Sequence, residues 1–238
     1  MQTQLIQITS RIICLLAISM ASYGKSLPLF KVEYDATIKG FAIKATRELK
    51  PLTDKQFTLH FQASSWAAEI NETAVFQWQD NHIQPYRYSY SQSILGKNKQ
   101  QSILFDHNNA TAAYLEKGNT SNISLLKNTF DKLSYQLQLQ LDVSNNKTLG
   151  YKVISKGYIK DYHFEILDEE IIDTKAGKLT AIKVKVIRSN KDKVTYIWFA
   201  KDWEYLLTKL EQYEGNKKKF TILLNNAVVN QQTVKGLQ

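Results

Sequence analysis

Cysteine is almost absent from this chain of 238 residues, and the single one, Cys14, lies in an apolar N-terminal stretch. Without that stretch the chain holds no thiol, which excludes a disulfide, a thiolate nucleophile and a cysteine-based metal site. Proline (three) and glycine (nine) are also scarce, and no low-complexity linker interrupts the sequence. We therefore predict a single β-rich domain over residues 22–238.

The N-terminal stretch is organised like a secretory signal peptide. Arg11 precedes an apolar run of about ten residues, which is too short to span a bilayer and ends in the small residues Ser19-Met20-Ala21. Cys14 sits inside the run and does not follow a lipid-attachment pattern, so we do not expect a lipoprotein. We predict that residues 1–21 are a cleavable signal peptide. An uncleaved anchor is the alternative.

The charge balance is basic, with 31 Lys and Arg against 22 Asp and Glu, a formal net charge of +9. The lysines mostly alternate with apolar residues, which is typical of the solvated faces of strands. A weak attraction to anionic lipid head groups or envelope polysaccharide is the functional alternative. We expect no nucleic-acid partner, because export separates the protein from nucleic acid and no such motif is present.

Most of the sequence alternates with period two, which indicates β-strands. Phe57, Leu59 and Phe61 oppose polar neighbours, and Tyr86, Tyr88 and Tyr90 form a second such row. Residues 106–128 are polar and rich in Asn, Thr and Ser, so we predict a loop with at most a short strand at 112–115.

A hairpin over residues 193–210 is expected near the middle of the fold. Its first strand is apolar on both faces, with Trp198 on one face and Ile197 and Phe199 on the other. Strands of this kind are usually covered on both sides. We place the turn at Ala200-Lys201-Asp202.

Two periods compete over residues 129–141. Leu133, Leu137, Leu139 and Leu141 fit a strand together with Tyr135, while residues 130, 133, 137 and 141 also form a helical stripe. The Leu and Gln content and a cap at Thr129 or Asp131 favour a helix. The pattern alone leaves both open.

Several stretches, in order along almost the whole mature chain, resemble the family called domain of unknown function 3108, found in exported proteins of Gram-negative bacteria. They are Tyr34 to Leu49, Arg87-Tyr88, Asp131 to Ser134, Tyr162 to Glu165, Asp173 to Leu179, and Trp198 to Asp202 with Tyr205-Leu206. Lys132 and Lys201 stand where such proteins often carry proline.

The resemblance implies a mainly β, strongly curved antiparallel sheet, a β-roll or half-barrel, with one helix near residues 129–142. The cleavable signal peptide predicts the periplasm as the location. The resemblance brings no known activity and no functional residues.

Motifs for catalysis are missing. The four histidines (60, 82, 107 and 163) show no metal-ligand spacing, and neither a nucleophile elbow nor a phosphate-binding loop occurs. Acidic pairs such as Glu69 and Glu72 are typical of solvated turns, although carboxylate chemistry has no signature in sequence. We predict no catalytic residue, no cofactor and no metal site.

Aromatic residues are the most informative feature, because a curved sheet has a concave face that a single helix cannot cover. Core and cross-strand packing is the simpler interpretation. The functional one is a groove for an acyl chain or a glycan. The candidate ligand-binding residues are Trp66, Trp78, Tyr86, Tyr88, Tyr90 and Trp198.

The sequence thus favours a non-catalytic binding or envelope-support protein of the periplasm, with an apolar or amphipathic ligand on the concave sheet face. A lipid or glycan of the cell envelope is the expected partner. The alternative is a periplasmic hydrolase that acts on an envelope polymer through paired carboxylates. Ligand, oligomeric state and protein partners stay open.

Overall fold

The computed structural model describes residues 26–38, 41–145, 147, 149–188 and 192–237. The predicted signal peptide, residues 1–21, lies outside the described residues. Within them, no helix is both long and apolar enough to cross a membrane.

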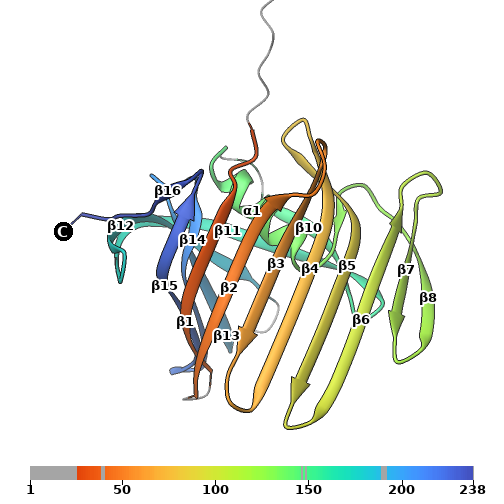
Figure 1. The fold of residues 1–238 in the computed structure, drawn as a ribbon, viewed down its shortest axis with the longest axis horizontal. Coiled ribbons are helices and arrows are strands. Elements are labelled where there is room, and N and C mark those ends of the chain that lie inside the picture. Colours follow the sequence, from red (N-terminus) through yellow and green to blue (C-terminus); the bar gives the residue numbers. More distant parts are fainter. Residues whose placement is uncertain (1–25, 39–40, 146, 148, 189–191, 238) are drawn as a thin grey trace, which may run out of the picture.

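One large β-sheet contains the strands of the described chain (Figure 1). The strands are β1 Phe30–Ile38, β2 Phe41–Pro51, β3 Gln56–Ser64, β4 Ala68–Gln79, β5 His82–Ile94, β6 Lys97–Asp106, β7 Thr111–Glu116, β8 Asn119–Ser124, β9 Thr129–Phe130, β10 Gly150–Ser155, β11 Tyr158–Thr174, β12 Gly177–Ile187, β13 Lys193–Ala200, β14 Leu206–Glu214, β15 Lys217–Val229 and β16 Gln232–Thr233. Its order is β8-β7-β6-β5-β4-β3-β2-β1-β15-β14-β13-β12-β11-β10-β9, with β16 on β15.

The sheet consists of two antiparallel meanders joined by the pairing of β1 with β15, in which Phe30 faces Val229. Only the short β9 runs parallel to its neighbour, β10. Strands β8 and β9 form the two edges of the strand order, so the sheet curves without closing. The predicted fold class, a curved and mainly antiparallel sheet with one helix, is confirmed.

Helix α1 (Ser134–Val143) lies in the hollow of this sheet. Thr129 and Phe130 form β9, so the helix begins later than the predicted residue 129. Leu137, Leu139 and Leu141 are all buried although they point in different directions. A helix buried nearly all round needs no single apolar stripe, which explains why the sequence also fitted a strand.

The start of α1 is fixed by Asp131. Its Oδ1 accepts hydrogen bonds from the backbone N–H groups of Leu133 and Ser134, both at 2.8 Å, and its Oδ2 accepts one from Ser134 Oγ at 2.7 Å. The Asp131 N–H in turn donates to Ser134 Oγ. Asp131 therefore caps the first turn, as the sequence suggested.

Two predictions about strands were wrong in detail. Most of the expected loop at 106–128 forms the hairpin of β7 and β8, whose polar residues flank the inward-facing Ala112, Tyr114 and Ile123. The later hairpin turns over residues 201–205, not at 200–202, because Glu204 and Tyr205 adopt positive φ before β14 begins.

Helix α1 covers only one end of the inner face, defined here as the sheet face that carries Tyr34, Leu59 and Phe76. Gln138 accepts a hydrogen bond from the Ile83 N–H at 2.8 Å, and Gln140 donates to the Glu204 carbonyl at 3.1 Å. Both contacts lie at the end of the sheet where β4 turns into β5 and β13 turns into β14.

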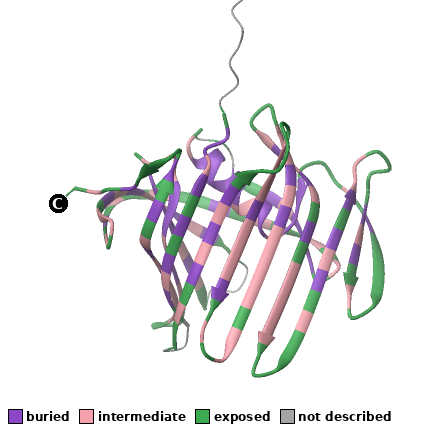
Figure 2. Cartoon of the chain, in the orientation of Figure 1, coloured by how far each residue is buried: buried purple, intermediate pink, exposed green. Residues whose placement is uncertain are grey.

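Burial on the inner face falls from that end to the other. Leu49, Leu59 and Phe76 are buried near the helix, whereas Ile43, Phe61 and Ile70, further along the same three strands, are only partly buried. Figure 2 shows this fall in burial along β2 and β4, whereas β3 is again buried near its far end, at Ala63. We call the end with Ile43, Phe61 and Ile70 the open end.

Candidate ligand site on the inner face

Two residues in the first turn of α1 are less buried than the rest of the helix. Tyr135 and Gln136 are half-buried, while every residue from Leu137 to Val143 is buried. Residues 135, 136 and 139 share one side of a helix. These three residues form one wall of a small cavity.

The opposite wall of this cavity comes from strands that are far apart in sequence. Arg47 of β2 lines it, together with Ile197 and Phe199 of β13 and Leu207 and Leu210 of β14. The cavity measures about 90 Å³. Its lining is apolar except for Arg47, Gln136 and the Tyr135 hydroxyl, so the guanidinium is its one charged group.

Arg47 points inward because of its position in β2. It alternates in phase with Ala45 and Leu49, and its pairing partners are Val32 on β1 and Phe61 on β3. Only 2% of the residue is exposed. The guanidinium carbon lies 5.4 Å from the centre of the Phe30 ring, a cation–π contact that offsets part of the cost of burial.

The Arg47 guanidinium is incompletely satisfied. Nε and Nη2 are buried and have no hydrogen-bond partner among the described residues. Burial lowers the pKa of Arg47, and the groups that oppose this effect are the hydroxyls of Tyr34 and Tyr135, not a carboxylate. A buried charge without a counter-ion is costly, so this geometry calls for a negative group.

Of the two tyrosines near Arg47, Tyr34 is buried and Tyr135 is half-buried. Burial raises the pKa of Tyr34 to about 12, while Arg47 acts in the opposite direction. The Tyr34 hydroxyl donates to the Leu207 carbonyl at 3.0 Å. Burial also raises the pKa of Tyr135, against the influence of Arg188 and Arg47. Both hydroxyls stay neutral near pH 7 and cannot neutralise the guanidinium.

A second polar group on the inner face is already paired. The Tyr88 hydroxyl donates to Glu72 Oε2 at 2.5 Å. Burial raises the pKa of Glu72, although Tyr88 and the charge of Lys132 lower it. Glu72 is therefore committed to Tyr88, and it is not among the groups that influence the pKa of Arg47.

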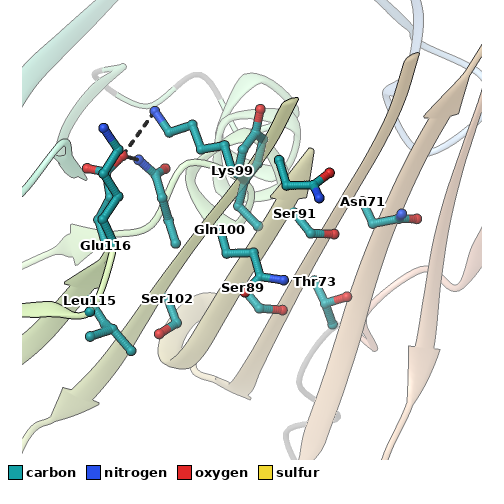
Figure 3. A pocket seen from close by; sticks show the side chains of 14 residues that line it. Asn71, Thr73, Ser89, Ser91, Lys99, Gln100, Ser102, Leu115 and Glu116 are labelled. Carbon is teal, nitrogen blue, oxygen red and sulfur yellow. Dashed lines mark hydrogen bonds and ion pairs between the residues drawn. The ribbon is translucent and has the colours of Figure 1, made fainter. Parts of the chain in front are cut away.

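A larger hollow of about 790 Å³ lies over β4 to β7 (Figure 3). Thr73, Ser89, Ser91 and Ser102 line it, and the two β5 serines alternate with the inward-facing Tyr88 and Tyr90. Lys99 closes one side through an ion pair with Glu116 at 3.1 Å. These short hydroxyl side chains offer neither an apolar surface nor an unpaired buried charge, so we prefer the smaller inner cavity.

The six aromatic residues singled out from the sequence do not form one cluster. Tyr88 is buried on the inner face, and Tyr90 is half-buried on the same face. The Tyr90 hydroxyl donates a hydrogen bond to Gln92 at 2.7 Å. Trp78 packs against the core near the helix, and Trp66 is 84% exposed in the turn between β3 and β4 at the open end.

Tyr86 and Trp198 lie away from the cavity. The Tyr86 hydroxyl donates to Gln77 at 2.7 Å, and its ring meets His107 edge-on. Trp198 is buried on the outer face against Ile172 and Ala181, because its neighbours Ile197 and Phe199 take the inner one. Its indole N–H donates to Glu170 at 2.8 Å.

The residues that line the cavity were not recognised from the sequence. One signal could have found Arg47, since a charged residue stands in phase with the apolar positions Ala45 and Leu49. No comparable signal marks Leu207 or Leu210, which look like ordinary core residues. Among the described residues, no cluster of three His, Cys, Asp or Glu side chains could hold a metal ion.

The fold and the cavity define a class of protein, an open and strongly curved β-sheet that wraps one helix. The chain belongs to the family of proteins of unknown function DUF3108, whose model matches residues 23–222. This confirms the resemblance found in the sequence. None of the curated proteins matches the sequence.

Among solved structures, the chain is similar to a β-barrel-like protein of the domain of unknown function DUF1849 from Brucella abortus. The two share 8% identity and a TM-score of 0.59, over 87% of this chain and 99% of the other. This likeness concerns the fold alone.

Two weaker matches are a candidate lipoprotein from Parabacteroides distasonis and a candidate exported protein from Bacteroides fragilis. The first has 13% identity and a TM-score of 0.35, the second 9% and 0.33. Each covers 84% of this chain and 95% of the other.

Proposed function

We propose that the mature protein is a non-catalytic binding protein of the periplasm that holds an apolar or amphipathic envelope ligand against its inner face. The observation that carries this proposal is the unequal cover of that face. Helix α1 buries one end, and Ile43, Phe61 and Ile70 stay partly uncovered at the other. Apolar surface left open in a concave site is typical of a ligand-binding groove.

Exposed apolar side chains at the open end support the same function. Phe41, Trp66 and Leu95 are 61%, 84% and 73% exposed and belong to three turns or strand ends there. The Leu95 N–H donates a backbone hydrogen bond of 3.0 Å to the carbonyl of Ala67, the residue after Trp66, so these two turns lie side by side. Apolar groups gathered at the mouth of a groove favour exchange with a lipid surface.

The alternative, a hydrolase with paired carboxylates, gains no support from the inner face. Asp131 is held by Leu133 and Ser134 as a helix cap, and Glu72 is held by Tyr88. Asp131 is a poor general acid or base, because both of its carboxylate oxygens already accept hydrogen bonds from the helix start.

Native mass spectrometry tests the proposal on the mature protein purified from a bacterial periplasm, before and after organic extraction. We expect an added mass that extraction removes. Ile70→Gln, which makes the open end polar, should reduce the fraction of loaded protein severalfold.

The matched control is Ile171→Gln, because Ile171 is also a strand isoleucine but is 67% exposed. It should load like the wild type. An unloaded wild-type protein that also fails to take up palmitate and hexadecanol after purification would refute the proposal.

A further inference from the structure

The unsatisfied part of Arg47 has a definite shape. Nε and the Nη2 amino group lie on the same edge of a guanidinium, so their N–H groups point in nearly the same direction. A planar carboxylate accepts two parallel hydrogen bonds from such an edge. Both nitrogens that lack a partner in Arg47 belong to this edge.

The space beside the guanidinium fits a small planar anion with an apolar continuation. The cavity of about 90 Å³ exceeds the room that one water molecule requires, and Leu139, Ile197, Phe199, Leu207 and Leu210 surround it. A sugar or a nucleotide has too many polar groups for such a lining. A carboxylate followed by methylene groups matches both the charge and the apolar wall.

No group of the described chain takes the place of this anion. The nearest hydroxyls, on Tyr34 and Tyr135, are neutral, and Tyr34 already donates to the Leu207 carbonyl. The Glu72 carboxylate is engaged by Tyr88. The negative charge that Arg47 requires is therefore expected to come from a ligand.

We infer that Arg47 binds the carboxylate of a fatty acid, with the acyl chain running from the cavity toward Phe61 and Ile70 at the open end. This inference rests on the proposed function and adds the chemical class of the ligand. It assigns to Arg47 a role in specificity, whereas the apolar inner face supplies affinity for any long chain.

The test compares equilibrium binding of three probes with the same chain, namely palmitate, hexadecanol and hexadecyl phosphate, to the delipidated mature protein. We expect palmitate to bind at least about tenfold more tightly than hexadecanol, the gain typical of hydrogen bonds to a charged group. Arg47→Met should abolish this preference and bring the affinities for palmitate and hexadecanol to the same value.

Arg87→Met is the control, because Arg87 has the same charge but is exposed on β5. It should keep the preference for palmitate. Unchanged palmitate preference in Arg47→Met, or tighter binding of hexadecyl phosphate than of palmitate, would overturn the inference. Equal binding of all three probes would also overturn it, yet leave the proposed function standing. Failure of every probe would refute both.

Discussion

Asp131 and Arg47 are both charged and both buried, 0% and 2% exposed, but their surroundings differ. Asp131 receives hydrogen bonds from two backbone N–H groups and one hydroxyl. Arg47 keeps two nitrogens without a partner among the described residues. Asp131 therefore stabilises the fold, whereas the buried and unpaired charge of Arg47 lowers its stability. We interpret the charge of Arg47 as a feature kept for binding.

The largest effect is expected from Asp131→Ala. The change removes the helix cap and leaves three buried donors without an acceptor, which should lower the free energy of unfolding by about 3–4 kcal/mol. The melting temperature should fall by roughly 6–15 °C for a domain of this size. Thermal unfolding followed by circular dichroism measures it. A fall of less than two degrees would show that α1 does not depend on its cap.

Arg47→Met should act with the opposite sign. It removes a buried cation that lacks a counter-ion and puts an apolar side chain of similar length in its place. We expect the ligand-free protein to gain about 2 kcal/mol, reduced by whatever the contact with Phe30 contributed. Chemical denaturation of delipidated protein measures it. If Arg47→Met unfolds more easily than the wild type, Arg47 stabilises the fold, as Asp131 does, and is not a residue kept for binding.

The same pair of residues shows what the sequence could predict. The cap was predictable because Asp131 lies three residues before Ser134, within one turn of chain. The environment of Arg47 depends on β13 and β14, which lie about 150 residues further along the chain, and on α1, which lies between β2 and β13 in the sequence. No local pattern reports such a convergence.

Strand alternation predicts which residues share a face but not which face is the inner one. Alternation places the two buried residues Trp198 and Phe199 on opposite faces, and only the sheet curvature decides that Phe199 lies on the inner one. The hairpin of β7 and β8 was predicted as a loop for a related reason. Near a sheet edge, polar residues such as Asn119 and Ser121 can form strands, since little of that face is covered.

A smaller effect, about 1.5 kcal/mol, is expected from Tyr88→Phe, which leaves the Glu72 carboxylate without its donor. Because this bond lowers the pKa of Glu72 against burial, its loss should raise that pKa further. The penalty should be greatest at neutral pH and shrink in acid, where Glu72 is protonated. Urea unfolding at both pH values measures it.

The matched control for Tyr88→Phe is Tyr90→Phe, whose hydroxyl donates to the uncharged Gln92. It should cost less and show no such pH dependence. Equal penalties for the two variants at every pH would contradict the assignment of Glu72 as the carboxyl partner of Tyr88.

The smallest effect is expected at a charge that is neither buried nor unpaired. Asp35 lies on the outer side of β1, where Lys175 at 2.7 Å and Lys44 bind its carboxylate. The hydrogen bond from Lys175, then that from Lys44, lowers the pKa of Asp35 to about 2. A carboxyl whose pKa is lower in the folded state stabilises the protein above its unfolded pKa near 4.

Asp35→Asn should therefore cost less than about 1 kcal/mol at pH 7, because water and salt screen such pairs. The difference from the wild type should vanish as the pH falls from about 4 to 2. Glu33→Gln, on the same strand and exposed, serves as the control. If Asp35→Asn lowered the free energy of unfolding at pH 7 as much as Asp131→Ala, exposed and buried charges would contribute equally to stability. Burial would then be no reason to treat Arg47 as a special case.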